Sequence, residues 1–459
     1  MPRVWLLCSW AIREVPCKLG RDLLGESEMD FVLGLFQQSP QLLYQLLSVP
    51  FAFLFYVLAR LECLTLTHRY IYLVLGGCAL AAVTMGPYAW VLLVPAFSTV
   101  LLVCFLRPRD AHPWVLGALM CWQTFWHLLI QYQEYWLLQP PDARLFLAMS
   151  GTMLLTQRAT TVSMDLQEGK ATPPTCGAEA LPYLSYTLYF PGLLGGPLHS
   201  FSQFLRFVER SSHSPPPLPL RPVLLKSLTA LSLEWARRVL TGFLVSHSPH
   251  LRPFWAPSQV LWVWAMSAAL RMRYYSHWAL SDALNNAAGL GFRGRDLGGT
   301  PLWDGVSDGE PWTVETSSRL SEYARRWNRT TAAWLRRLVF ERSRAAPLAL
   351  TFGFSAWWHG LHPGQVAGFM AWAATVQADY QIHRRLRPLV SSPGRRLACV
   401  CLSWVQTQLV VTWVVVAVEL RNISSVWLLC RSHASWFPLL YILLTFFSSP
   451  AKCLMRKII

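Results

Sequence analysis

Apolar segments follow one another along most of this chain and are separated by short polar or basic connections. The expected helices fall near residues 42–59, 70–86, 88–106, 113–132, 145–157, 181–197, 222–246, 258–281, 345–362, 363–382, 399–418 and 434–449. A helix needs about 20 apolar residues to cross the hydrocarbon core of a bilayer. The pattern therefore predicts an all-α polytopic membrane protein.

One of these segments is interrupted by helix-breaking residues. Residues 181–197 contain the run Phe190-Pro191-Gly192-Leu193-Leu194-Gly195-Gly196-Pro197. A broken helix is tolerated at membrane depth only where protein or a water-filled cavity covers its free backbone groups. This segment is the first candidate for a re-entrant rather than a spanning element.

Positive charge indicates the orientation, because Arg and Lys collect in cytosolic loops. Basic residues gather in the segment 319–344, between residues 384 and 396, and in the tail, at Lys452, Arg456 and Lys457. Counting crossings between basic loops leaves one crossing too many between residues 158 and 319. We therefore predict about eleven transmembrane helices plus one re-entrant segment, with a lumenal N-terminus and a cytosolic C-terminus.

Residues 1–28 stand apart from this series. Their apolar patch, residues 4–12, is too short to span a bilayer and is closer to a weak signal-like segment. Met29 offers a second plausible start. We treat residues 1–28 as an extension of uncertain role and residues 29–459 as one membrane domain.

Composition supports a membrane protein and argues against several other classes. The chain is 53% hydrophobic and 14% charged, whereas soluble domains carry about 25% charged residues. The net charge of +16 would suggest nucleic acid in a soluble protein, but cytosolic Arg and Lys explain it here, so no nucleic-acid partner is expected. The 11 cysteines show neither a CxxC pair nor zinc-ligand spacing, so no metal site is predicted.

The long connection 282–344 contains no expected span. Its first part, Gly289 to Pro311, is rich in Gly and Asp and is typical of a loop. Its second part interleaves Trp and Leu at near-helical spacing with eight arginines, namely Arg319, Arg325, Arg326, Arg329, Arg336, Arg337, Arg342 and Arg344. This pattern fits an amphipathic helix at the membrane surface, and it fits a cytosolic mouth for an anionic ligand, since Arg suits phosphate. The two interpretations are compatible.

Three histidines, His127, His277 and His359, lie in apolar segments. A buried histidine is more often structural than catalytic, but His359 follows paired tryptophans and precedes Gly360 and a helix-ending His362-Pro363-Gly364. An ionisable group inside a membrane indicates a functional site, and imidazole is suited to general-base catalysis. The chain has no GxSxG motif, so a covalent acyl-enzyme is not expected.

Two groups of residues carry a resemblance to a known family. The first is Trp327-Asn328 with Trp334-Leu335-Arg336-Arg337-Leu338-Val339-Phe340, and the second is Phe354-Ser355-Ala356-Trp357-Trp358-His359-Gly360-Leu361-His362-Pro363-Gly364-Gln365. Supporting stretches are Leu154 to Arg158, Tyr274 to Trp278 and Ala378 to Tyr380. Together they resemble the membrane-bound O-acyltransferase family, and the likeness covers roughly Met29 to the C-terminus.

The resemblance implies a function. It implies transfer of a medium-chain acyl group, octanoyl, from octanoyl-CoA as co-substrate to a serine hydroxyl of the peptide precursor proghrelin, in the endoplasmic reticulum membrane. No permanently bound cofactor is implied. The family's catalytic pair corresponds to Asn328 and His359. The chemistry agrees, because a serine hydroxyl needs a base and a thioester oxygen needs a donor as it gains charge.

The acyl donor would meet a second set of residues inside an intramembrane catalytic tunnel. We expect Arg325 and Arg326 to hold the CoA phosphates, and the acyl chain to be lined by Trp327, Phe352, Trp358 and Trp372. One difficulty arises from the predicted topology. Asn328 lies on the cytosolic side, whereas His359 lies about fifteen residues into the next helix, roughly 20 Å deeper. The pair can cooperate only if the Asn328 segment folds inward or if acyl-CoA reaches His359 through the tunnel.

Two alternatives remain at this point. A lipid or sterol O-acyltransferase of the same family would use the same residue pair on a different acceptor. A transporter would also place histidine in broken helices, but it would show internal repeats, and we find none.

Overall fold

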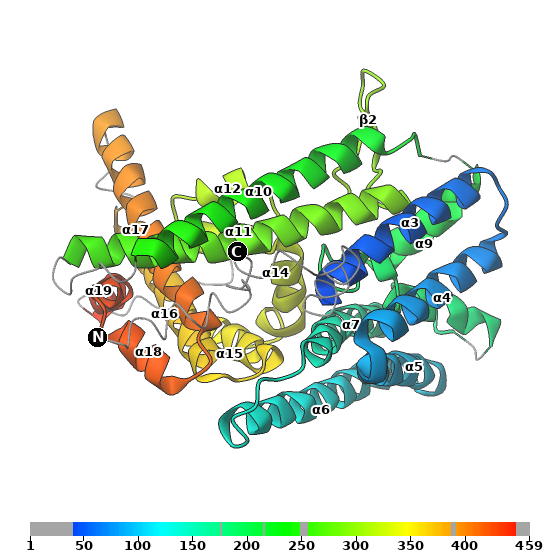
Figure 1. Cartoon of the computed structure of the whole chain (residues 1–459), viewed down its shortest axis with the longest axis horizontal. Coiled ribbons are helices and arrows are strands. Elements are labelled where there is room, and N and C mark those ends of the chain that lie inside the picture. Colours follow the sequence, from blue (N-terminus) through cyan, green and yellow to red (C-terminus); the bar gives the residue numbers. More distant parts are fainter. Residues whose placement is uncertain (1–39, 175–176, 214–215, 248–255, 387–391, 447–459) are drawn as a thin grey trace, which may run out of the picture.

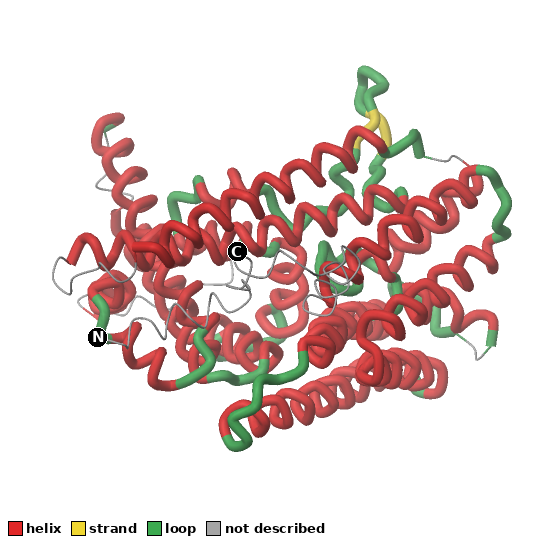
Figure 2. The backbone as a smooth tube through the Cα atoms, viewed as in Figure 1, coloured by secondary structure: helices red, strands yellow, loops and turns green. Residues whose placement is uncertain are grey.

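The computed structural model describes residues 40–174, 177–213, 216–247, 256–386 and 392–446. The extension 1–28 and the basic tail at residues 452–457 lie outside this part of the chain. The described residues are mostly helical, with a single small hairpin (Figure 2). The predicted all-α class is confirmed.

A first group of helices packs around one apolar core. One helix of this group buries a charged side chain, that of Arg158, which is 2% exposed. The group consists of α3 (Pro40–Arg60), α4 (Leu66–Met85), η1 (Gly86–Tyr88), α5 (Ala89–Phe105), α6 (Pro108–Tyr135), α7 (Ala143–Gln167), η2 (Ala178–Ala180), α8 (Leu181–Thr187), η3 (Phe190–Gly192) and α9 (Phe201–His213). Local sequence marks several of their starts: Thr65 accepts a hydrogen bond from the amide of His68, and Asp142 from that of Arg144. Such caps satisfy amides that the first helical turn leaves free.

A second group packs around a separate apolar core. It consists of α10 (Leu220–His247), α11 (Ala256–Ala288), α12 (Pro311–Glu315), α13 (Leu320–Arg326), α15 (Pro347–His359), α16 (Pro363–Leu386), α17 (Pro393–Glu419), α18 (Ile423–Cys430), η7 (His433–Ser435) and α19 (Trp436–Phe446). Between α11 and α12 the antiparallel strands β1 (Gly294–Arg295) and β2 (Pro301–Leu302) form the hairpin, with Gly294 opposite Leu302.

Helix α14 (Arg329–Leu335) and the π-helical turn η5 (Arg336–Phe340) lie between the two groups (Figure 1). A third, small apolar cluster forms here from Met120 of α6, Met164 of α7, Trp334 of α14, Leu338 of η5 and Trp358 of α15. The Arg-rich segment therefore enters the junction of the two groups, and Trp334 is 3% exposed.

Three described stretches are long and apolar enough to cross a bilayer, namely Leu43–Arg60, Leu66–Phe105 and Pro393–Glu419. Other long helices carry polar side chains that face the interior. Gln157, Arg158 and Asp165 of α7 are all buried, for example, and they lower the apolar content of that helix. The number of crossings, about eleven, stays a prediction.

The predicted break within residues 181–197 is confirmed. The segment contains only α8 and η3, followed by irregular chain. Arg158 supports it by donating to the carbonyl oxygens of Tyr186 (3.4 Å), Thr187 (3.3 Å) and Tyr189 (3.0 Å). Whether the segment re-enters the membrane stays a prediction. The sequence pattern missed α9 and α18, because neither is a continuous apolar run of spanning length.

Candidate active site

Asn328 occupies the break between α13 and α14. Its backbone is left-handed, with φ 45° and ψ 62°, and its side-chain oxygen accepts a hydrogen bond from the amide of Thr331 at 3.3 Å. Asn tolerates this conformation better than most residues, and its oxygen caps the new helix. Because the oxygen is used by the cap, the NH₂ group of the Asn328 amide is left for another partner.

The residues that follow Asn328 anchor α14 inside the protein. Gln157 donates to the hydroxyl of Thr331 at 2.9 Å, and the indole of Trp334 donates to the hydroxyl of Thr160 at 2.9 Å. Both contacts come from α7. The sequence left open whether the Asn328 segment folds inward. The structure shows that it does. Trp334 is buried in protein rather than among lipid head groups.

His359 is the last residue of α15, and Gly360 ends the helix with φ 119°. The imidazole stacks on Phe369 of α16 with ring centres 5.1 Å apart, and it contacts the ring of Trp358 at 4.7 Å. Among the described residues, neither ring nitrogen of His359 has a hydrogen-bond partner, and neither is fully occluded. The imidazole is thus held by its faces, while its nitrogens remain available.

Helix α6 holds the end of α15 in place. Gln123 donates to the carbonyl oxygen of Trp358, and Gln131 donates to that of Gly360. His127 lies so close that a Cβ on Gly360 would be 2.8 Å from its Nδ1 atom. Sequence reasoning missed the two glutamines, whose only signal is that polar residues recur along an otherwise apolar helix.

Aromatic rings connect His359 to the residue before Asn328. From Phe369 the series continues to Trp372 (6.4 Å, nearly parallel at 8°), then to Tyr323 (6.5 Å), and finally to Trp327 (5.8 Å). Phe352 packs on Trp372 at 5.6 Å. The structure therefore brings three predicted acyl-lining residues, Trp327, Phe352 and Trp372, into one aromatic array with His359.

Two members of this array, Phe369 and Tyr323, were not predicted. Phe369 lies three residues before Trp372 on α16, and residues at this spacing share a helix face, which is the signal that could have found it. The fourth predicted aromatic residue, Trp358, also contacts the His359 ring, but it is not part of the series that leads to Trp327. It contacts Trp334 at 5.2 Å and belongs to the small cluster at the junction of the two helix groups.

The two predicted phosphate-binding arginines differ in their surroundings. Arg325 is exposed and donates from Nη1 to the hydroxyl of Tyr380 at 3.0 Å. Arg326 donates to the carbonyl oxygen of Thr313 at 2.8 Å and forms an ion pair with Glu322 at 2.7 Å. Most of the Arg325 fork therefore remains free for an anion, whereas Arg326 also holds α12 and α13.

The matched residues identify the family. The sequence model of the membrane-bound O-acyltransferase family matches residues 77–406, a range that includes Asn328, His359 and the whole aromatic array. The chain belongs to the membrane-bound O-acyltransferase family.

Similar proteins agree with this assignment. The membrane-bound ghrelin O-acyltransferase of Mus musculus is 42% identical over 432 residues, which are 92% of this chain and 98% of that protein. Its counterpart in Rattus norvegicus is 40% identical over 431 residues, with the same coverage. The membrane-bound glycerophospholipid O-acyltransferase 2 of Rattus norvegicus is 30% identical over 340 residues, 66% of this chain and 65% of that protein.

As a membrane-bound O-acyltransferase, the chain is an enzyme that uses an acyl donor as co-substrate. No hydrogen bond or ring contact joins Asn328 to His359 within the part of the chain that the structure describes. Cooperation between them would therefore need a substrate that reaches both. No group of three or more His, Cys, Asp or Glu among the described residues is arranged to hold a metal ion.

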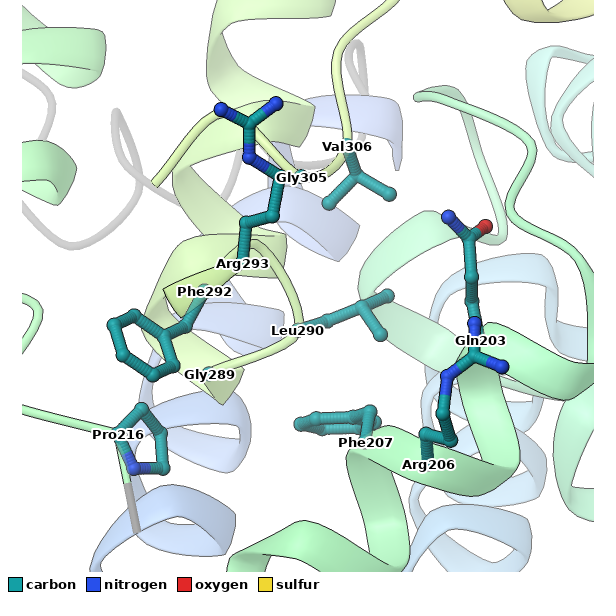
Figure 3. Close-up of a pocket in the computed structure, with 10 residues that line it drawn as sticks. All are labelled: Gln203, Arg206, Phe207, Pro216, Gly289, Leu290, Phe292, Arg293, Gly305 and Val306. Atoms are coloured by element: carbon teal, nitrogen blue, oxygen red, sulfur yellow. The ribbon is translucent and has the colours of Figure 1, made fainter. Parts of the chain in front are cut away.

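A pocket of about 230 Å³ opens between α9 and the segment 289–306 (Figure 3). Phe207 and Leu290 face it, and Arg206 and Arg293 lie at its margin. None of the predicted site residues lines this pocket. The predicted intramembrane tunnel stays a prediction.

Proposed function

We propose that this enzyme transfers an octanoyl group from octanoyl-CoA to a serine hydroxyl of proghrelin. Proghrelin is favoured as the acceptor by the comparison of two relatives. The chain is 42% identical to a ghrelin O-acyltransferase and covers 98% of it, whereas it is 30% identical to a glycerophospholipid O-acyltransferase and covers 65% of it. General-base chemistry is supported by the His359 imidazole, which stacks at the end of the aromatic array and whose nitrogens form no hydrogen bond among the described residues.

In the proposed reaction His359 acts as the general base. Its free nitrogen takes the proton of the serine hydroxyl while the serine oxygen attacks the carbonyl carbon of the thioester. The C–S bond then breaks, and the proton passes from the imidazole to the leaving CoA sulfur. The new ester and free CoA balance the reaction without a covalent acyl-enzyme.

Asn328 supplies a hydrogen-bond donor in this mechanism. Its side-chain oxygen is fixed by the Thr331 amide, so the NH₂ group points away from the helix cap. That group would orient the donor or meet the charge that develops on the thioester oxygen. Its orientation is set before substrate binds, which reduces the reorganisation needed during the reaction.

The remaining predicted residues would bind the acyl donor. Trp327, Phe352 and Trp372 would contact the octanoyl chain, and Trp358 would close the far side of the site. Arg325, with its open fork, and Arg326 would hold the CoA phosphates from the cytosolic side. The bilayer in question is that of the endoplasmic reticulum, with the N-terminus in the lumen and the C-terminus in the cytosol.

One assay tests the acceptor directly. Detergent-purified enzyme is given labelled octanoyl-CoA together with one of three acceptors: proghrelin peptide, a lysophospholipid or a sterol. We expect label on the peptide serine, and none on a peptide in which this serine is replaced by alanine. The second candidate function, lipid acylation, is favoured by the glycerophospholipid relatives. Faster labelling of the lysophospholipid than of the peptide would establish it instead.

A further inference from the structure

The loop that joins β2 to α12 contacts both sides of the chain break at Asn328. The carbonyl oxygen of Asp308 accepts a hydrogen bond from the amide of Arg329 at 2.8 Å. The neighbouring Gly309, with φ 157°, lies so close to Arg326 that a Cβ there would be 2.9 Å from its carbonyl oxygen. Asp308 and Gly309 therefore touch the chain immediately before and immediately after the turn that carries Asn328.

The side chain of Asp308 adds a third contact. Its carboxylate accepts a hydrogen bond from the hydroxyl of Thr330, and the oxygen of that hydroxyl accepts one from the amide of Leu198 at 2.9 Å. The first turn of α14 is thus tied to the 305–310 loop and to the irregular chain after η3. These three segments are far apart in sequence, so only the tertiary fold brings them together.

Burying the carboxyl group of Asp308 is unfavourable in free energy. Its side chain is 2% exposed, and it forms no ion pair within the described residues. Burial raises the pKa of Asp308 to about 7, while the Thr330 hydrogen bond opposes the rise. A buried carboxyl group without an ion pair is unfavourable unless its hydrogen bonds are needed. The left-handed backbone of Asn328 is also unfavourable for a residue with a side chain, and such conformations persist only where neighbours enforce them.

We propose that Asp308 is a positioning residue that holds the Asn328 turn in its left-handed conformation and thereby aims the Asn328 amide at the substrate. The proposal rests on the catalytic role of Asn328 given above. Asp308 acts through Thr330 and the Arg329 amide and touches no substrate. A misplacement of about 1 Å in a reacting group lowers a rate by roughly 10²-fold, so losing this support should appear chiefly in kcat.

The test compares four variants of the full-length enzyme. We expect Asp308→Ala to lower kcat by about 10- to 100-fold while the KM for octanoyl-CoA stays within about twofold. Asp308→Asn keeps an acceptor oxygen for the Thr330 hydroxyl and should restore most of kcat. Thr330→Val removes the same hydrogen bond and also the acceptor for the Leu198 amide, so it should be at least as slow as Asp308→Ala, whereas Thr330→Ser should resemble the parent.

Two controls separate positioning from simple loss of folding. Asp304 lies on the same loop, is exposed and, among the described residues, forms an ion pair with Arg293 alone, at 3.4 Å, so Asp304→Ala should match the parent enzyme. The double variant Asp308→Ala/Thr330→Val should be no slower than the slower single variant, because both changes remove the hydrogen bond between Asp308 and Thr330. Activity is compared per mole of enzyme that remains monodisperse in detergent.

Three results would overturn the inference. The first is a parental kcat in Asp308→Ala, and the second is a kcat of Asp308→Asn as low as that of Asp308→Ala. The third is a double variant whose loss in kcat equals the product of the two single losses. Failure of the proposed function is a separate outcome. If Asn328→Ala keeps parental activity, the catalytic role of Asn328 is wrong; if Asn328→Ala is inactive but Asp308→Ala is not, only the positioning role is wrong.

Discussion

At the residue scale, Asn328 and His359 are held in place through different kinds of side-chain contact, and this difference defines their chemistry. Asn328 uses its oxygen to cap α14 and leaves its NH₂ group as a donor. His359 is held through its ring faces by Phe369 and Trp358 and leaves its nitrogens open. One residue is therefore prepared to donate a hydrogen bond and the other to accept a proton.

Removing either member of this pair should abolish most acyl transfer. His359→Ala removes the base, which is typically worth about 10²- to 10⁴-fold in rate. Asn328→Ala should cost a similar order if its amide meets developing charge. Because both act on one transition state, the double variant should be little slower than either single variant. Single-turnover transfer of labelled octanoyl measures all three, and a well-folded His359→Ala enzyme with near-parental rate would refute the base assignment.

His362 is the matched histidine control. It lies three residues after His359, is 4% exposed, and its Nδ1 atom is 2.9 Å from the hydroxyl of Tyr135. His362→Ala should keep most activity but lower the stability by about 1 kcal/mol, the usual contribution of one hydrogen bond. Thermal unfolding in detergent and the transfer rate, measured on the same sample, distinguish this structural loss from a catalytic one.

Arg325 should contribute to donor affinity rather than to the chemical step. Arg325→Ala should raise the KM for octanoyl-CoA more than the KM for peptide, and the difference should shrink at high salt, where charge attraction at an exposed site is screened. Arg326→Ala should in addition lower stability, because Arg326 bonds Thr313 and Glu322. Equal changes in both KM values for Arg325→Ala would indicate a structural role instead.

At the scale of elements, the broken segment 181–197 depends on one buried cation. Arg158 of α7 is 2% exposed and donates to three carbonyl oxygens in and after α8. Gly192 leaves room for it, since a Cβ there would be 2.6 Å from an Arg158 nitrogen. The chain after η3 then reaches Thr330 through Leu198, so Arg158 supports the candidate site indirectly.

Replacing Arg158 by leucine should destabilise this element strongly. Three buried carbonyl oxygens would lose a charged donor, and a hydrogen bond to a charged group contributes about 1.5–3 kcal/mol. The carbonyl oxygens of Tyr186 and Tyr189 keep backbone amide donors, so the loss is largest at Thr187. We expect a lower melting temperature in detergent and a lower yield of monodisperse enzyme, whereas Arg109→Leu, at an exposed position of α6, should have no effect. Parental melting behaviour of Arg158→Leu would show that the segment is held by its apolar contacts alone.

At the scale of the whole molecule, α14 lies between two groups of helices (Figure 1), each with its own apolar core. Side chains of α14 and η5 form a third, smaller apolar cluster with residues of both groups. The Arg-rich segment that carries Asn328 thus contributes Trp334 and Leu338 to the interior junction, while several of its arginines remain exposed. With the predicted orientation, the cytosolic end of this junction is where the acyl donor would enter.

The orientation can be checked by glycosylation. Asn328-Arg329-Thr330 and Asn422-Ile423-Ser424 both match the acceptor pattern, and both asparagines cap helices in the folded chain, Asn422 through the amide of Ser425 at 2.7 Å. We predict that neither is modified. An endoglycosidase-sensitive mobility shift that disappears in Asn328→Gln would contradict both the cytosolic placement and the catalytic role of Asn328.

Much of the helical framework was predictable from sequence, because apolar runs must be buried or placed in lipid, and a helix satisfies the hydrogen bonds of its own backbone. The bounds of α3, α5, α10 and α16 follow the predicted runs closely. Asn328, His359 and all four aromatic residues of the acyl-lining set were also predicted from sequence, and their roles stay predictions. The short helices α9 and α18 were not, since no continuous apolar run marks them.

By itself, the sequence determined the helical class and the break at residues 181–197, because these depend on local composition. The assignment of Asn328 and His359 as the catalytic pair comes from the family motif and stays a prediction. Only the tertiary structure decided that α14 turns inward, that a series of aromatic rings joins His359 to Trp327, and that Asp308 contacts both Arg329 and Thr330 beside the Asn328 turn. Each of these contacts joins residues separated along the chain, and it exists only where packing places their side chains within reach.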